Sequence, residues 1–375
     1  MSDDIDPLVR RARERGPSRR PSADGPAATP GDFLNDFSES LPSVLDIETW
    51  RAGRHTVTPV EVADTHAGLL FNGAVEACDG TSDVHDTLAL TIHQIGVSLV
   101  SYRGERGCWQ QRLFRKDLRL HNDDPVVAVM DLLERRHRRG GLHPTPRDVL
   151  SELAQRGLMS YAERAVLAGK ATAPWRLGHG SPAPLELVGA RFTDVVIESI
   201  KVIRRLIEHG RIVFVASEPS DRALLTIGQG LYPLEYAIVG TMAERITPYL
   251  DQWAPTHAPT VDASWDGEVL SPQEWVRRLR DELAPRVVYG LYRATMLAPP
   301  QLFYAHVDHA HVAARIAIAD SVLLEQRGFP LLIDLADRVC KSVYAGGSLK
   351  DMAASAYAAA GAPFRYQSER PTRDL

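Results

Sequence analysis

Apolar runs and short alternating stretches divide the first third of the chain into strands. Residues 69–78 are mostly small or apolar and predict a buried strand that ends in a sharp turn at 78–82. Two β-rich stretches follow, at 87–102 and 109–115. The three stretches together predict an antiparallel meander.

Helical periodicity and buried strand-like runs then alternate along the rest of the chain. A helix at 191–209 precedes the apolar run at 211–217, which therefore predicts a parallel strand reached through a crossover helix. The other predicted helices are 125–134, 146–171, 221–225, 234–250, 272–283, 330–344 and 349–360. The other predicted strands are 286–293, 302–308 and 312–319, together with a short strand and its closing turn at 175–182.

The order of these elements predicts an α/β protein with a mixed sheet, in which the meander forms an antiparallel edge and the crossovers add a parallel part. The RNase H-like fold has this shape, here with flanking helices and helical insertions. Residues 1–30 are rich in Arg, Pro, Ser and Gly and predict a disordered basic arm. The folded domain then covers 31–361, and 362–375 form a polar C-terminal tail.

Composition excludes several classes of protein. The 375 residues are 44% hydrophobic and 24% charged, with no apolar run long enough to cross a membrane and no apolar signal segment at the start. The three cysteines are far apart and lack CxxC spacing, which favours reduced thiols in a cytoplasm over a zinc module. We therefore expect a cytoplasmic protein with no membrane partner.

The net charge of −5 gives no global basic field, so any nucleic-acid partner requires a local basic surface. The densest cluster in the folded part ends the predicted helix at 125–134 and consists of Arg135, Arg136, Arg138 and Arg139. It is the first candidate for contact with a nucleic-acid backbone. A C-capped, solvated helix end is the alternative.

The candidate chemistry begins at Asp79, which is followed by Gly80, Thr81 and Ser82. A carboxylate at the tip of a buried strand, next to glycine and hydroxyls, can hold a hard cation where a substrate phosphate can approach. An ordinary Asp-Gly turn is the competing interpretation. Glu163 lies on a predicted amphipathic helix and, taken alone, is typical of a solvated helix carboxylate.

Three pieces of the sequence together resemble the NurA nuclease family. They are the Asp79-Gly80-Thr81 stretch, the helix with Glu163 followed by a strand and the turn at 178–181, and the segment GFPLLIDLADR at 328–338. The last is similar to the closing G-[YF]-P-x-x-L-x-x-A-H-R helix of that family. The resemblance runs discontinuously from about Gly73 to Ala360 and implies an RNase H-like DNA nuclease. It also implies a homodimer that works beside a HerA-like hexameric ATPase.

Two positions depart from the family pattern. The chain has His179 where NurA-like proteins have Asp, and Asp337 where they have His. Together the departures are a swap that preserves the inventory of two Asp, one Glu and one His. The resemblance thus implies a catalytic metal site of Asp79, Glu163, His179 and Asp337, which would bind Mn²⁺ or Mg²⁺ and hydrolyse phosphodiesters. In this site His179 is either a ligand or a proton carrier.

Other interpretations remain open at this point. The chain can be an inactive relative that acts as a scaffold or DNA clamp. His306, His309 and His311, with Asp308, form a candidate second metal cluster, although strand alternation would place His306 on the other face. Glu218 follows a buried strand and is a further candidate at the active edge of the sheet. A serine hydrolase is excluded by the lack of a G-x-S-x-G motif.

Overall fold

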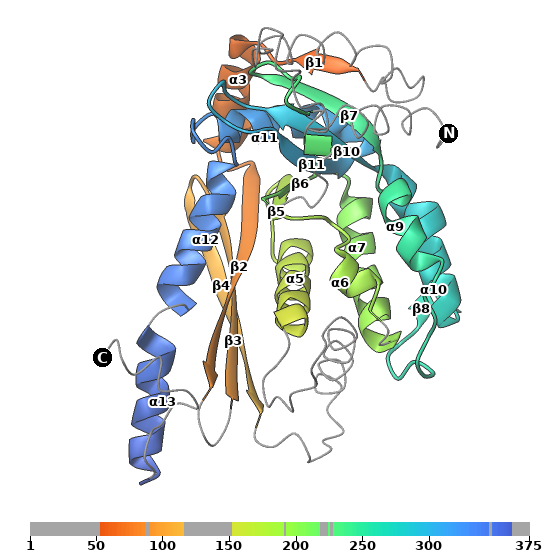
Figure 1. Ribbon diagram of the computed structural model, residues 1–375, viewed down its shortest axis with the longest axis vertical. Helices are drawn as coiled ribbons and strands as arrows, with labels where there is room; N and C mark the ends of the chain where they lie inside the picture. The colour runs from red at the N-terminus through yellow and green to blue at the C-terminus, as the bar shows by residue number, and fades with distance from the viewer. Residues whose placement is uncertain are drawn as a thin grey trace, which may run out of the picture.

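A computed structural model describes residues 53–86, 91–115, 152–190, 193–217, 224–225, 228–344 and 347–361. Within them, one nine-stranded mixed sheet has the order β1-β7-β10-β11-β6-β5-β2-β3-β4 (Figure 1). The strands are β1 (Arg54–Thr56), β2 (Val75–Asp86), β3 (Thr91–Ser101), β4 (Gly104–Arg115), β5 (Trp175–His179), β6 (Ile212–Ala216), β7 (Glu235–Thr241), β10 (Val287–Arg293) and β11 (Gln301–His306).

The central part of this sheet has the strand order of the RNase H-like fold. Strands β2, β3 and β4 pair antiparallel in sequence order, and β5 and then β6 join the other side of β2 in parallel. Helices α5 (Glu152–Gly169) and α7 (Thr193–His209) precede β5 and β6 and provide the crossovers that parallel strands require. The remaining strands extend the sheet antiparallel beyond β6. The predicted fold class is therefore confirmed.

The helices surround this sheet (Figure 1). Besides α5 and α7 they are α3 (Pro59–Thr65), α6 (Leu185–Val188), α9 (Met242–Leu250), α10 (Pro272–Arg278), α11 (Ala310–Ser321), α12 (Leu331–Tyr344) and α13 (Gly347–Ala359). Shorter segments are π-helical at His66–Leu70 and Leu279–Leu283 and 3₁₀-helical at Ala284–Arg286 and Val307–His309, and β8 (Ser264–Trp265) pairs with β9 (Glu268–Val269). No helix in the described ranges is long and apolar enough to span a bilayer.

Helices α5 and α12 cover opposite faces of the meander, and this places the candidate site between them (Figure 1). On the α5 face, a Cβ built on Gly80 would meet the side chains of Met159 and Glu163. On the α12 face, Ser98 Oγ donates a 2.6 Å hydrogen bond to the carbonyl of Ala336. Residue 79 is the cross-strand partner of Ser98 and therefore projects on the α12 face.

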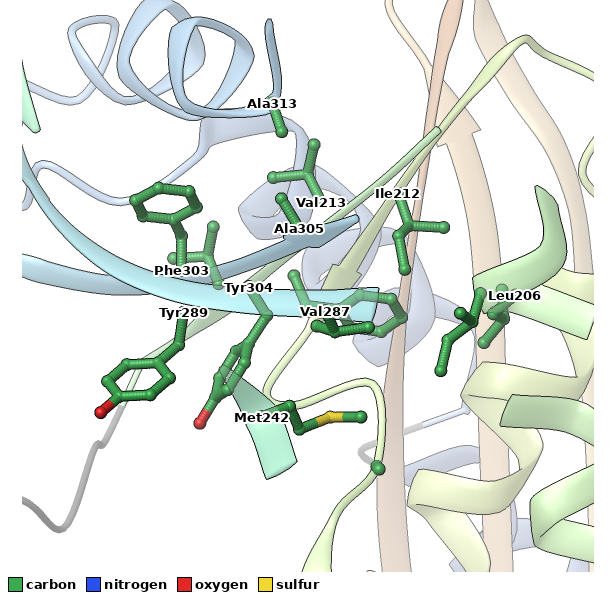
Figure 2. Close-up of a cluster of buried hydrophobic side chains, with 14 of the residues drawn as sticks. Leu206, Ile212, Val213, Met242, Val287, Tyr289, Phe303, Tyr304, Ala305 and Ala313 are labelled. Atoms are coloured by element: carbon green, nitrogen blue, oxygen red, sulfur yellow. The ribbon is translucent and has the colours of Figure 1, made fainter. Parts of the chain in front are cut away.

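A buried apolar cluster ties the antiparallel extension to the parallel strands (Figure 2). It includes Val213 of β6, Val287 of β10, and Phe303 and Tyr304 of β11, the last two on opposite faces of their strand. Side chains from the adjacent helices complete the cluster: Leu206 of α7, Met242 of α9 and Ala313 of α11. These strands form part of one continuous core, so the edge where β5 and β6 end is held by buried neighbours on both faces.

The first strand and the turn after it were predicted wrongly in part. Residues 66–70 are π-helical, and the strand begins only at Val75. It does not turn at 78–82 but continues to Asp86, because each residue from Ala77 to Asp86 has a cross-strand partner on β3. Gly80 serves a different purpose from a turn. Its missing side chain leaves room for α5.

Two further predictions were wrong about the type of element. The stretch 234–250 was predicted as one helix, but Glu235–Thr241 is strand β7, and only Met242–Leu250 is helical. The stretch 312–319 was predicted as a strand and lies within helix α11. Most of α11 is buried, so its sequence lacks the polar face that marks an amphipathic helix, and short apolar runs do not distinguish the two periods.

Several predictions fall on parts of the chain outside the described residues. These are the basic arm at 1–30, the helix at 125–134, the cluster of Arg135, Arg136, Arg138 and Arg139, and the tail at 362–375. Glu218 also lies outside them. Cys78, Cys108 and Cys340 form no disulfide with one another in the structure.

Candidate functional site

The candidate site lies at the edge of the sheet where two parallel strands end. Strand β5 ends at His179 and β6 at Ala216, while β2 continues past them. The parallel register aligns Cys78 with Gly178 and His179 with Val215. Because the carboxyl ends of parallel strands meet at one edge, Asp79, His179 and Ser217 become neighbours there.

Hydrogen bonds connect these three side chains in a line. Nδ1 of His179 lies 3.2 Å from Oδ1 of Asp79, and Nε2 lies 2.7 Å from Oγ of Ser217. Oδ1 of Asp79 also accepts a 2.9 Å hydrogen bond from the backbone N–H of Gly80. The ring of Phe329 packs edge-on against His179, with the centroids 5.8 Å apart. The line runs from the buried carboxylate of Asp79 to the exposed residue Ser217.

The carboxylates around His179 change its titration. Burial opposes the charged imidazolium and by itself would lower the pKa of His179. The hydrogen bond and charge of Asp79, together with the charge of Glu163, outweigh burial and raise this pKa above its ordinary value. The geometry therefore favours positive charge at His179 while no other cation is present.

Glu163 approaches Gly80 from α5, on the face of the sheet opposite to the one on which Asp79 projects. A Cβ on residue 80 would lie 2.7 Å from Oε1 of Glu163, so only glycine permits this approach. Oε2 accepts a 2.9 Å hydrogen bond from Arg164, whereas Oε1 is buried without a hydrogen-bond partner. Burial and the charge of Asp79 raise the pKa of Glu163 to about 7, against the opposing effects of Arg164 and His179. A buried carboxylate oxygen with no partner is costly and marks a place for a cation or a proton.

Arg164 fixes the turn that follows β5. Its guanidinium donates to the carbonyl of Ser160 on its own helix, and to the carbonyls of His179 and Ser181 in the turn. Gly180, between the last two, has φ +83°, a conformation that favours glycine. The buried cation thereby holds His179 and Glu163 at fixed positions relative to each other.

Asp337 lies on α12 and forms an ion pair with Lys341. Nζ of Lys341 donates a 2.7 Å hydrogen bond to Oδ2 of Asp337, one helical turn away. This bond raises the pKa of Lys341, and the charge of Asp79 adds to the effect. Burial raises the pKa of Cys340, and the charges of Asp79 and Asp337 add to it. Asp337 thus lies on the α12 face near Asp79, while no hydrogen bond or ion pair among the described residues joins it to the other three predicted residues.

The donors in this site suit a divalent cation, although they do not form a finished cage. No group of three or more His, Cys, Asp or Glu side chains within the described ranges is arranged as a ready metal site. Oδ1 of Asp79 and Nδ1 of His179 are 3.2 Å apart, however. Two ligands at about 2.1 Å and right angles on an octahedral ion are separated by about 3 Å. A carboxylate and an imidazole at this spacing suit Mn²⁺ or Mg²⁺, and the unpartnered Oε1 of Glu163 is a further oxygen donor next to Gly80.

The histidine cluster does not offer a competing metal site. The rings of His306 and His309 are 6.2 Å apart, and His309 also contacts Trp175. His311 lies in helix α11, where its Nδ1 is 2.7 Å from the hydroxyl of Tyr236. The strand alternation expected for these residues was wrong because His311 is helical. The three rings have different partners and do not converge.

Sequence reasoning missed three residues of the site: Ser217, Arg164 and Lys341. Ser217 had a signal, because it follows a buried strand of the parallel part, and such strand ends meet at one edge. Arg164 and Lys341 had none. Helical periodicity does not indicate which surface arginine turns inward or which lysine faces a distant carboxylate.

Comparisons with known proteins find solved structures to which this chain is similar at low sequence identity. No protein-family model and no curated protein matches this chain. The NurA nuclease of Sulfolobus solfataricus is 11% identical over 83% of this chain and 87% of its own, with a TM-score of 0.43. A NurA structure with manganese is 10% identical over 71% of this chain and 85% of its own, with a TM-score of 0.36. Endonuclease V of Ciona intestinalis, in complex with an inosine-containing DNA, is 11% identical over 74% and 86%, with a TM-score of 0.28.

Proposed function

We propose that this chain is a divalent-metal-dependent nuclease that hydrolyses DNA phosphodiesters. The observation that carries the proposal is the contact between Asp79 and His179 beside the unpartnered, buried Oε1 of Glu163. The three side chains belong to three separate elements, β2, α5 and β5. A buried carboxylate oxygen without a partner, such as Oε1 of Glu163, is costly, and a bound cation would compensate it.

In this proposal Asp79, Glu163 and His179 hold Mn²⁺ or Mg²⁺, and Asp337 supplies the fourth ligand of the predicted set. The bound ion would supply Lewis acidity and an activated water for phosphodiester hydrolysis. Arg164 keeps the ligands in place through the turn after β5. The side chain of Lys341 is 58% exposed on the α12 face and offers a positive charge to a phosphate that approaches several carboxylates.

The substrate and the partners come from the resemblance of the sequence motifs to NurA. That family implies DNA as substrate, a homodimeric enzyme and a HerA-like hexameric ATPase that delivers the DNA. The cluster of Arg135, Arg136, Arg138 and Arg139 is the proposed backbone contact on this chain, where each neutralised phosphate would make binding more sensitive to salt. The thiols favour a cytoplasmic enzyme.

The experiment is a cleavage assay on end-labelled single-stranded and double-stranded DNA, with Mn²⁺ or Mg²⁺ and with EDTA. Glu163→Gln keeps the size of the side chain and removes its charge, and it should reduce cleavage at least about 100-fold. Asp308→Asn is the matched control, because the side chain of Asp308 is 74% exposed and away from the site. Metal-independent binding of DNA without cleavage by the wild-type chain would instead support the inactive scaffold or clamp.

A further inference from the structure

Both ring nitrogens of His179 have a side-chain partner, and the two partners differ in kind. Nδ1 faces the buried carboxylate of Asp79 at 3.2 Å, and Nε2 faces the hydroxyl of Ser217 at 2.7 Å. Ser217 follows directly after β6, whose backbone pairs with β5 up to His179. Its position relative to the imidazole is therefore set by the sheet.

A neutral imidazole carries one N–H, so this arrangement has two alternative proton patterns. If Nδ1 carries the proton, it donates to Asp79, and the hydroxyl of Ser217 donates to Nε2. This is the pattern of a serine nucleophile with its base. If Nε2 carries the proton, it donates to Ser217, and the lone pair of Nδ1 faces Oδ1 of Asp79. Two acceptors at that distance repel each other unless a cation lies between them.

Without a cation the carboxylate of Asp79 favours the first pattern, because it attracts an N–H on Nδ1, whereas a cation bound by Nδ1 and Oδ1 requires the second pattern. A serine nucleophile needs hydrogen-bond donors aimed at the oxyanion that its reaction creates. The buried cation nearby, Arg164, donates instead to the carbonyls of His179 and Ser181 and to Glu163. The charges of Asp79 and Glu163 attract a metal ion.

We propose that Ser217 is a positioning residue that accepts a hydrogen bond from Nε2–H of His179 and so leaves Nδ1 free to bind a divalent cation with Asp79. The inference rests on the proposed function, which it deepens by assigning the ligand atom and its support. Metal-binding histidines usually donate their other N–H to such a partner, which fixes the tautomer and the ring orientation. Ser217 does not touch the ion itself.

The test measures the affinity of the full chain for Mn²⁺ and Mg²⁺ by titration calorimetry, without DNA. Ser217→Ala should weaken binding about 10- to 100-fold, the effect typical of such supporting groups. Ser217→Thr keeps the hydroxyl and should restore most of the affinity. Ser264→Ala, which removes a hydroxyl bonded to Asp262 in the β8–β9 hairpin, should leave it unchanged. Because Ser217 is exposed, we expect all these variants to melt like the wild type.

The ¹⁵N resonances of His179 in the Mg²⁺-loaded chain give a second readout. They should show a protonated Nε2 and a deprotonated, ligated Nδ1. Equal metal affinity of the wild type and Ser217→Ala would overturn this inference but not the proposed function. A wild-type chain that binds no divalent ion would overturn both. Labelling of Ser217 by a fluorophosphonate, with the proton on Nδ1, would overturn the inference in favour of a serine nucleophile.

Discussion

Nδ1 of His179 lies 3.2 Å from Oδ1 of Asp79, although the two residues are 100 positions apart in the sequence. The parallel pairing of β2 with β5 brings them together. Glu163 approaches from α5, in the space left by Gly80, and interacts electrostatically with both residues. The predictions below follow from this relationship.

Replacing Asp79 by Ala should reduce DNA cleavage at least about 100-fold while the fold persists. Asp79 is one of two neighbouring carboxylates, and its charge raises the pKa of Glu163. Its removal should therefore leave the melting temperature of the metal-free protein unchanged or higher. Cleavage assays and thermal melts in EDTA check this. Loss of activity accompanied by a collapsed melt would instead assign Asp79 a structural role.

Activity should require Mn²⁺ or Mg²⁺ and should not require zinc, because the donors at the site are mainly carboxylate oxygens. Dialysis against EDTA should abolish cleavage, and addition of Mn²⁺ or Mg²⁺ should restore it. A preparation that stays fully active in EDTA, or that recovers only with Zn²⁺, would contradict the carboxylate site.

The metal-free protein should lose stability as the pH rises from about 5 to 8. The pKa of Glu163 is about 7 in the folded chain, above its ordinary value of 4.5. A raised pKa contributes stability that is fully present below pH 4.5 and is lost as the pH rises through 7. The effect is on the order of a few kcal/mol.

Urea unfolding in EDTA at several pH values measures this slope. Glu163→Gln should flatten the slope and be more stable than the wild type at pH 8. Part of the slope should remain, because the raised pKa of His179 acts in the same direction. A profile of the variant that follows the wild type at every pH would show that Glu163 is not the group that titrates.

Gly80→Ala should destabilise the protein by about 1–3 kcal/mol, since the added methyl group overpacks the contact between β2 and α5. Its Cβ would lie 2.7 Å from Oε1 of Glu163 and 2.9 Å from Cγ of Met159. Displacement of Glu163 should also reduce cleavage. Gly169→Ala, at the end of the same helix and with no neighbour within 4 Å, is the matched control. Equal stability of the two variants in urea would contradict the close approach of α5.

The exchange of His179 and Asp337 relative to the family pattern gives the fifth prediction. The double variant His179→Asp with Asp337→His should cleave DNA faster than either single variant, because each single change alters the charge of the site and the double change restores it. Rates of all four proteins form a complete double-mutant cycle. A double variant whose rate is only the product of the two single effects would show that the two residues do not share one ion.

The sequence by itself determined those elements whose own apolar and polar positions are sufficient to identify them as helix or strand. Helix α7 has an apolar stripe on one side, and β6 is a short, wholly apolar run, so both were predicted close to their observed bounds. The same local patterns predicted β3, β4, β5 and α12. Their order was sufficient to predict the RNase H-like arrangement, because two neighbouring strands that are joined through a crossover helix run parallel.

Only the tertiary structure decided which residues meet. Gly80 suggested a local turn, whereas its role is to admit a helix more than 70 residues further along the chain. The residues of α11 were predicted as a strand, and those of β7 were predicted as part of a helix. Both elements are buried on several sides, so they lack the polar positions that distinguish a helical period from a strand period. Ser217 and Arg164 contribute through hydrogen bonds to residues distant in the sequence. Such contacts depend on the register of neighbouring strands and on the packing of helices against the sheet, and neither leaves a periodic signal in the chain.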